Sequence, residues 1–119
     1  MKTLLVVDDE LSGAEVLALI LEEEGYRVFT AANGRQGLQR AQEVRPDLVI
    51  LDFMMPVMDG AEMGQRLRAA PSLSTVKIVM CSSVEEDTVR EFFTGYDAFL
   101  RKPFDIDRAL AVIARLLQD

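Results

Sequence analysis

The chain has 119 residues, which is long enough for one domain with one hydrophobic core and too short for two. Half of the residues are hydrophobic, which excludes intrinsic disorder, and the formal charge of −7 opposes binding to a nucleic-acid backbone. The chain has no histidine, so any metal would have to be a hard cation held by oxygen ligands.

The first half of the chain predicts alternating strands and helices. Short β-favouring runs indicate the strands, and apolar residues three and four apart indicate the helices. In order, we predict a strand over 3–7, a helix from Leu11 that ends before Gly25 with Leu11, Ala14, Ala18 and Leu21 on its buried side, a strand over 26–30, a weaker helix around Leu38 and Ala41 that ends before Pro46, and a strand over 48–52.

The second half continues this alternation. Pro71 ends a third helix, and Gly95 interrupts a fourth. In order, we predict a helix with Met63, Leu67 and Ala70 on its apolar side, a strand over 76–80, a helix with Val89, Phe92, Phe93 and Tyr96 on one side, a strand over 98–100, and a helix capped by Asp105 with Ile106, Leu110, Ile113 and Leu117 inward.

No apolar run is long enough to span a bilayer, and Met1-Lys2 leads directly into a strand without a signal-peptide pattern. We therefore expect a cytoplasmic protein with no membrane partner and no direct nucleic-acid partner. The single cysteine, Cys81, cannot form an intramolecular disulfide, and we interpret it as a small buried hydrophobic residue.

Strands that alternate with helices through short connections predict an α/β fold with a parallel sheet and right-handed crossovers. Polar residues follow the ends of four of the predicted strands. Because the carboxyl ends of parallel strands share one edge, these residues should converge on one pocket. They are Asp8, Asp9, Asp52, Ser82 and Lys102.

These residue types suit phosphoryl chemistry. Carboxylates brought together repel one another, and Mg²⁺ would relieve that repulsion while also binding a substrate phosphate. Lys102 and Ser82 can stabilise the charge on a phosphoryl group, and Asp52 can accept the group as an acyl phosphate. Simpler interpretations remain at this point: Asp8 and Asp9 can cap the first helix, and Ser82 can be an ordinary turn hydroxyl.

The chain resembles the response-regulator receiver domains of two-component signalling, and the resemblance covers all of residues 1–119 as a single receiver domain. It implies a doubly wound, five-stranded parallel sheet of flavodoxin-like order 2-1-3-4-5 with helices on both faces. The matching residues are Asp8-Asp9, Asp52 with Met55-Pro56, Met58-Asp59-Gly60, Ser82, and Lys102-Pro103-Phe104.

The resemblance also implies roles for individual residues. Asp52 would be the phosphoacceptor, with Ser82 as the switch hydroxyl and Lys102 as the phosphoryl contact. Mg²⁺ would be held by Asp8, Asp9, Asp52 and the main-chain carbonyl of Met54. Phe99 would be the aromatic switch residue, and the Lys102-Pro103 bond would be cis. We interpret Met55 and Met58 as loop residues that pack inward.

Two departures from the family pattern stand out. The interval from Ser82 to Lys102 is slightly short, which predicts a trimmed loop or fourth helix, and Ser83 replaces the usual alanine. In this family, polar side chains two residues beyond the phosphoacceptor and the switch hydroxyl often position the hydrolytic water. Met54 and Val84 occupy those places here, which predicts a long-lived phosphorylated state.

The leading hypothesis is thus a phosphorylatable switch and not a conventional enzyme. Its partners would be a histidine kinase or histidine phosphotransfer protein as donor and a downstream protein at the face near Phe99. A phosphohydrolase of the haloacid-dehalogenase type would need an acid at Met54, and a flavodoxin-like nucleotide binder would need a glycine-rich loop. A degenerate receiver is disfavoured by the intact acidic residues.

Overall fold

The computed structural model describes residues 1–118, in which strands and helices alternate. The strands are β1 (Thr3–Val7), β2 (Arg27–Ala31), β3 (Leu48–Asp52), β4 (Lys77–Ser82) and β5 (Ala98–Arg101). The helices are α1 (Leu11–Glu23), α2 (Gly34–Val44), α3 (Gly60–Ala69), α4 (Glu86–Arg90) and α5 (Ile106–Leu116). Most predicted boundaries differ from these by only a few residues.

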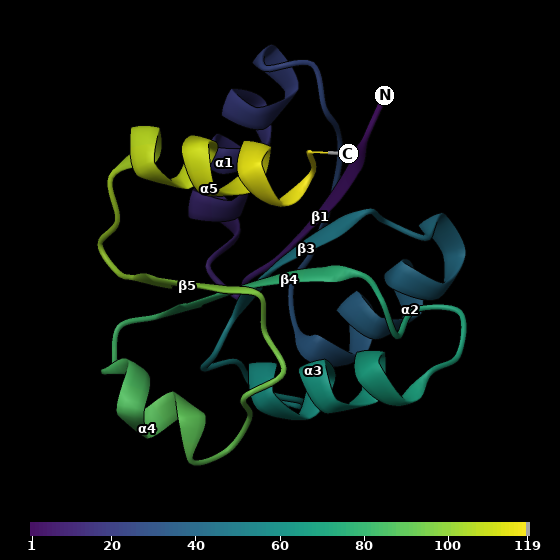
Figure 1. Cartoon of the computed structure of the whole chain (residues 1–119), viewed down its shortest axis with the longest axis vertical. Coiled ribbons are helices and arrows are strands. Elements are labelled where there is room, and N and C mark those ends of the chain that lie inside the picture. Colours follow the sequence, from purple (N-terminus) through teal and green to yellow (C-terminus); the bar gives the residue numbers. More distant parts are fainter. Residues whose placement is uncertain (119) are drawn as a thin grey trace.

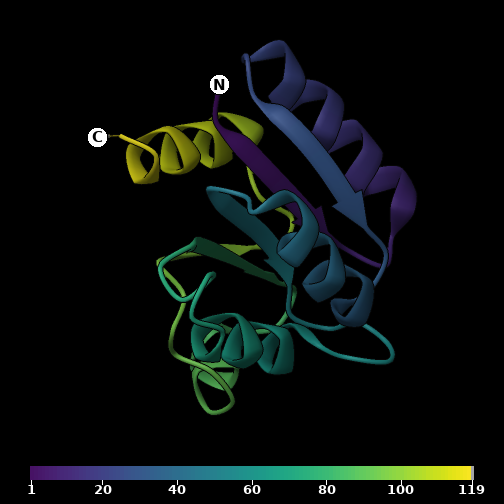
Figure 2. The ribbon, with the colours of Figure 1, turned by 90° about the vertical axis from the view of Figure 1, so that its right-hand side faces the viewer.

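The strands form one parallel sheet in the order β2-β1-β3-β4-β5, which confirms the predicted topology. Helices α1 and α5 cover one face of the sheet, and α2, α3 and α4 cover the other (Figure 1). Figure 2 shows the three layers from the side. Because every crossover returns the chain in the same direction, all strands end at one edge.

Alternate strand residues supply two apolar cores, as expected for a sheet covered on both faces. Val49 and Leu51 of β3 enter the core under α2, α3 and α4, whereas Leu48 and Ile50 enter the core under α1 and α5. All of β3 is buried. No helix in residues 1–118 is long and apolar enough to cross a membrane.

Two expectations about the helices are wrong. The helix predicted from Val89, Phe92, Phe93 and Tyr96, with its break at Gly95, ends already at Arg90. Beyond Arg90, the carbonyls of Phe92 and Gly95 accept hydrogen bonds from α3 side chains, at 2.9 Å each. Leu11, predicted on the buried side of α1, is the first residue of that helix and is 51% exposed. The shortening of α4 agrees with the trimmed interval after Ser82.

Candidate functional site

Asp52 is the last residue of β3 and remains only 9% exposed. The following loop returns to it, because the Gly60 amide donates to the Phe53 carbonyl at 2.9 Å. A Cβ atom on Gly60 would overlap the Asp52 carbonyl oxygen, so only glycine fits at this position. Asp59 caps α3 by accepting from the Glu62 amide at 2.9 Å. The Asp59-Gly60 pair therefore does more than turn the chain: it fixes the backbone beneath Asp52.

The sheet brings the predicted carboxylates together. Asp8 and Asp9 follow β1, the neighbour of β3, and offer oxygen atoms within 4.8 Å of each other and of an Asp52 oxygen. Asp52 is buried, Asp8 is half-buried and Asp9 is exposed. A cation bound at this cluster would thus contact one buried, one half-buried and one exposed carboxylate.

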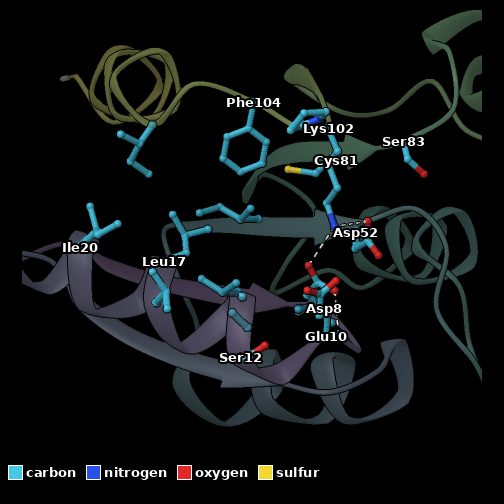
Figure 3. Close-up of a pocket in the computed structure, with 18 residues that line it drawn as sticks. Asp8, Glu10, Ser12, Leu17, Ile20, Asp52, Cys81, Ser83, Lys102 and Phe104 are labelled. Carbon is cyan, nitrogen blue, oxygen red and sulfur yellow. Dashed lines mark hydrogen bonds and ion pairs between the residues drawn. The ribbon is translucent and has the colours of Figure 1, made fainter.

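Lys102 reaches the same cluster from the loop after β5. Its Nζ lies 3.0 Å from Asp52 Oδ1 and 3.0 Å from Asp8 Oδ2 (Figure 3). The Lys102 amide donates to the Ser82 carbonyl at 2.7 Å, and the Lys102-Pro103 bond is cis, as predicted. One lysine therefore joins residues that lie far apart in the sequence.

Burial and neighbouring charges shift the pKa values of Asp52 and Lys102. Burial raises the pKa of Asp52; Lys102 opposes the rise, and Asp8 and Asp9 add to it. Burial alone would lower the pKa of Lys102, but its hydrogen bonds with Asp8 and Asp52 dominate, and the net shift is upward. The lysine is therefore a permanent cation at neutral pH. Burial, by contrast, disfavours the charged form of the Asp52 carboxyl group.

Ser82 ends β4 and is 1% exposed. Its Oγ accepts from the Val84 amide at 2.9 Å, and its neighbour Cys81 pairs in register with Asp52. Ser83 is exposed, and its carbonyl accepts from Arg101 Nε at 3.0 Å. The buried Ser82 hydroxyl thus lies one residue from the strand partner of Asp52, and its role as the switch stays a prediction.

A cavity of about 640 Å³ extends from the cluster between α1 and α5 (Figure 3). Leu17 and Ile20 of α1 and Phe104 after β5 line its apolar part, together with Cys81. Cys81 is 2% exposed, and burial raises the pKa of its thiol to about 12. Cys81 is therefore a neutral buried thiol, which confirms its interpretation as a hydrophobic residue.

The helix-cap explanation of the acidic pair is wrong for α1. The N-cap residue of α1 is Glu10, and it has no side-chain cap hydrogen bond. Asp8 Oδ1 accepts instead from the Glu10 amide at 3.0 Å, which forms a local turn that was not predicted. The preference of aspartate for such turns is the signal that predicts it. This bond orients Asp8 while its other oxygen faces Lys102.

Two of the three methionines in the loop after β3 pack inward, as predicted. Met55 and Met58 are half-buried and pack against the core under α2 and α3. Met54 is 61% exposed, and within residues 1–118 its carbonyl accepts no hydrogen bond. That carbonyl retains its full capacity to bind a ligand.

The donor set fits Mg²⁺. It consists of the carboxylate oxygens of Asp8, Asp9 and Asp52, all hard ligands, and the mutual repulsion of the carboxylates favours a divalent cation between them. Within residues 1–118, this is the only carboxylate, histidine or cysteine cluster with that spacing. With Lys102 beside it, the arrangement can bind a phosphoryl group and stabilise its charge.

Comparison with protein families matches residues 4–114 to the response regulator receiver domain. The chain is 33% identical over 120 residues to the DNA-binding dual master transcriptional regulator RpaA of Synechocystis, covering 99% of this chain and 50% of RpaA. It is 40% identical over 116 residues to the DNA-binding response regulator MtrA of Mycolicibacterium paratuberculosis, covering 95% of this chain and 50% of MtrA. The chain thus spans about half the length of these relatives.

The chain is also similar in structure to solved receiver-domain proteins. The Vibrio cholerae chemotaxis protein CheY4 has a TM-score of 0.92 at 33% identity, covering 98% of this chain and 99% of CheY4. The receiver domain of a sensor histidine kinase from Pseudomonas aeruginosa has a TM-score of 0.86 at 26% identity, covering 97% of this chain and 96% of that one. In that structure a magnesium ion is coordinated in the active-site cleft.

Proposed function

Because the chain belongs to the response regulator receiver domain family, we propose that it is a phosphorylation-dependent switch in which Asp52 accepts a phosphoryl group from a phosphohistidine of a partner protein. The donor would be a histidine kinase or a histidine phosphotransfer protein, since the chain has no histidine of its own. Residues 1–119 would act as one cytoplasmic receiver domain. A downstream protein would bind the face near Phe99.

The observation that carries the proposal is the contact of Lys102 Nζ with Asp52 Oδ1 at 3.0 Å beside Asp8 and Asp9. In the transfer, an Asp52 oxygen attacks phosphorus while the phosphorus–nitrogen bond of the donor histidine breaks. The products are an aspartyl phosphate and a free imidazole. Lys102 would leave the carboxylate to contact the phosphoryl oxygens, and the Ser82 hydroxyl would donate to one of them.

Asp8, Asp9, Asp52 and the Met54 carbonyl would hold Mg²⁺. The bound ion would neutralise negative charge on the phosphoryl oxygens during transfer. The chain would assist its own phosphorylation and dephosphorylation without being a conventional enzyme. A haloacid-dehalogenase-type hydrolase has no support, because exposed Met54 stands where its general acid would be.

The test uses a labelled small acyl phosphate as donor, with and without Mg²⁺. The wild-type chain should incorporate label only with Mg²⁺, and Asp52→Asn should not incorporate it. Asp59→Asn is the matched control, because asparagine can still cap α3 while the phosphoacceptor is unchanged. Equal labelling of Asp52→Asn and wild type would refute the proposal.

A further inference from the structure

The cavity between α1 and α5 extends well beyond the acidic cluster (Figure 3). Its volume of about 640 Å³ is within the range of pockets that hold small organic molecules, about 300 to 1,000 Å³. Asp8, Asp52 and Lys102 line its polar end, and the rest of the wall is mainly apolar. The proposed phosphoryl transfer uses the polar end only, so the apolar part has no role in it.

The protein covers the apolar part of the cavity incompletely. Leu17, Ile20 and Phe104 are large apolar side chains, yet all three are only half-buried. Figure 3 shows Phe104 on one side of the cavity, with Leu17 and Ile20 on the other. The sheet residues of the wall, Val6 and Ile50, are buried. An apolar molecule between α1 and α5 would therefore remove apolar surface from water, which favours binding.

The polar end of the cavity carries negative charge that has no partner. Among the lining residues in the described part of the chain, Lys102 is the one cation, and its Nζ already pairs with Asp8 and Asp52, at 3.0 Å each. Within residues 1–118, the Glu10 carboxylate makes no ion pair or hydrogen bond. Its Oε1 lies 3.9 Å from the place that a Cβ atom would take on Gly13, another lining residue. The unpaired charge is therefore that of Glu10.

We propose that this cavity binds a small organic cation with an apolar body, namely an aromatic or alkyl amine. The ammonium group would pair with Glu10 beside Asp8. The apolar body would lie between Leu17, Ile20 and Phe104. Seven residues of helix rise about 10 Å, so an amine held at Glu10 needs a body of about that length to reach Leu17.

Anionic and neutral molecules fit this cavity less well. An anion would find Lys102 already paired with two carboxylates, and it would be repelled by Glu10. The N-terminus of α1 adds only roughly half a positive charge, which does not offset these carboxylates. A neutral molecule would make the same apolar contacts but would leave Glu10 unpaired. The charges of the polar end therefore favour a cation.

The cavity shares Asp8 with the acidic cluster, so its ligand would affect metal binding. Asp8 lines the cavity and also offers an oxygen atom to the cluster with Asp9 and Asp52. An organic cation at Glu10 would place a second positive charge near bound Mg²⁺, and each cation would lower the affinity for the other. The ligand would then slow phosphorylation of Asp52; only this last consequence rests on the proposed function.

The test is a chemical-shift titration of the isotopically labelled whole chain in Mg²⁺-free buffer with phenylbutylamine, phenylbutanol and phenylbutyrate. These probes share one apolar body and differ in the charge of the head group. We expect the amine to have a Kd about threefold or more below that of the alcohol, and the acid to bind least. The largest shifts should occur at Leu17, Cys81 and Phe104, which line the cavity.

Variants of α1 locate the bound amine. Ile20→Trp would fill the cavity from a half-buried position and should raise the Kd of the amine about tenfold or more. Leu19→Trp, a similar change at an exposed residue outside the lining, should bind normally. Glu10→Gln should bind the amine and the alcohol equally, whereas Glu15→Gln, exposed on the same helix, should keep the preference for the amine. Because Glu10 is exposed, its variant remains decisive if Ile20→Trp fails to fold.

The proposal is overturned if the amine does not bind, if the acid binds as tightly, or if Glu10→Gln keeps the preference for the amine. The amine should also weaken Mg²⁺ binding, measured by titration, and slow labelling of Asp52 by a small acyl phosphate. Unchanged Mg²⁺ affinity would overturn the coupling to the cluster. A chain that takes up no label even without amine would contradict the proposed function, whereas the Mg²⁺-free titration would still decide whether the cavity binds the amine.

Discussion

Asp52 is a buried carboxyl group that forms an ion pair with Lys102, and this burial has a consequence for stability. Burial raises its pKa above the ordinary value of 3.8 despite the ion pair with Lys102. A carboxyl group with a raised folded-state pKa contributes stability that is fully present below its unfolded pKa and is lost as pH rises through its folded pKa. At pH 7 the Asp52 charge therefore lowers the free energy of unfolding.

We expect Asp52→Asn to melt a few degrees above wild type at pH 7 without divalent cations, because it removes this charge. The gain should shrink as the pH falls and Asp52 becomes protonated in wild type. Thermal denaturation at a series of pH values measures this. Asp59→Asn, at an exposed N-cap, is the control and should show no such gain. An Asp52→Asn protein no more stable than wild type at pH 7 would show that burial does not dominate.

We propose that Met54 and Val84 lengthen the lifetime of the phosphorylated state. Neither side chain can orient water by hydrogen bonding, and Met54 is exposed beside the site. We expect the aspartyl phosphate to decay several-fold more slowly in wild type than in Met54→Asn/Val84→Glu, as measured by loss of label after a pulse of phosphodonor. Val57→Asn, an exposed change in the same loop, is the control. Decay of wild type as fast as the double variant would contradict this assignment.

The positions of the site residues could be predicted, but their pairing could not. Asp8, Asp9, Asp52 and Lys102 follow strand ends, and parallel strands place such residues at one edge. Which carboxylate faces Lys102 depends on side-chain directions that strand periodicity does not specify. In the structure Lys102 contacts Asp8 and Asp52, and Asp9 remains exposed.

Helix α4 shows why the helical spacing of apolar residues is not enough to predict where a helix ends. Phe92, Phe93 and Tyr96 have the spacing of a helix, but they are tertiary contacts of a non-helical segment. Phe92 lies 5.9 Å from the Phe53 ring, and Phe93 packs where Gly64 has no side chain. These residues have modest helix propensity, so tertiary contacts decide their conformation. By contrast, α5 has caps and a continuous apolar side, and its prediction was confirmed.

Arg68 of α3 stabilises the segment that replaces the end of α4. Its guanidinium donates to the carbonyls of Gly95, Ser74 and Val76, and it pairs with Asp97 at 2.9 Å. The side chains of this pair are only 25% and 30% exposed. One cation therefore joins α3 to the chain on both sides of β4.

We expect Arg68→Met to lower the free energy of unfolding by about 3 kcal/mol, because three partly buried carbonyls lose a charged donor while the apolar stem is kept. Arg66→Met on the same helix is the control. Arg66 pairs with Glu62 in an exposed salt bridge, and its loss should cost about 0.5 kcal/mol or less. Urea denaturation of both variants measures the difference. Equal effects would mean that the Arg68 hydrogen bonds contribute little.

At the scale of the whole molecule, a metal at the acidic cluster should stabilise the fold by mass action, since the ligands come from separate strands that only folding brings together. We expect the melting temperature to rise with millimolar Mg²⁺ in wild type and not in Asp9→Ala. Asp107→Ala, an exposed change distant in sequence, should respond as wild type does. A wild-type melting temperature indifferent to Mg²⁺ would rule out this site.

In the proposed function, Asp52 becomes an aspartyl phosphate. Borohydride reduces an aspartyl phosphate to homoserine, so mass spectrometry of the reduced and digested chain can locate the phosphorylated residue. After incubation with a phosphorylated histidine phosphotransfer protein and Mg²⁺, we predict homoserine at position 52, and none when Mg²⁺ is chelated. Homoserine at another aspartate, or unmodified Asp52 after label has been transferred to the chain, would contradict the account.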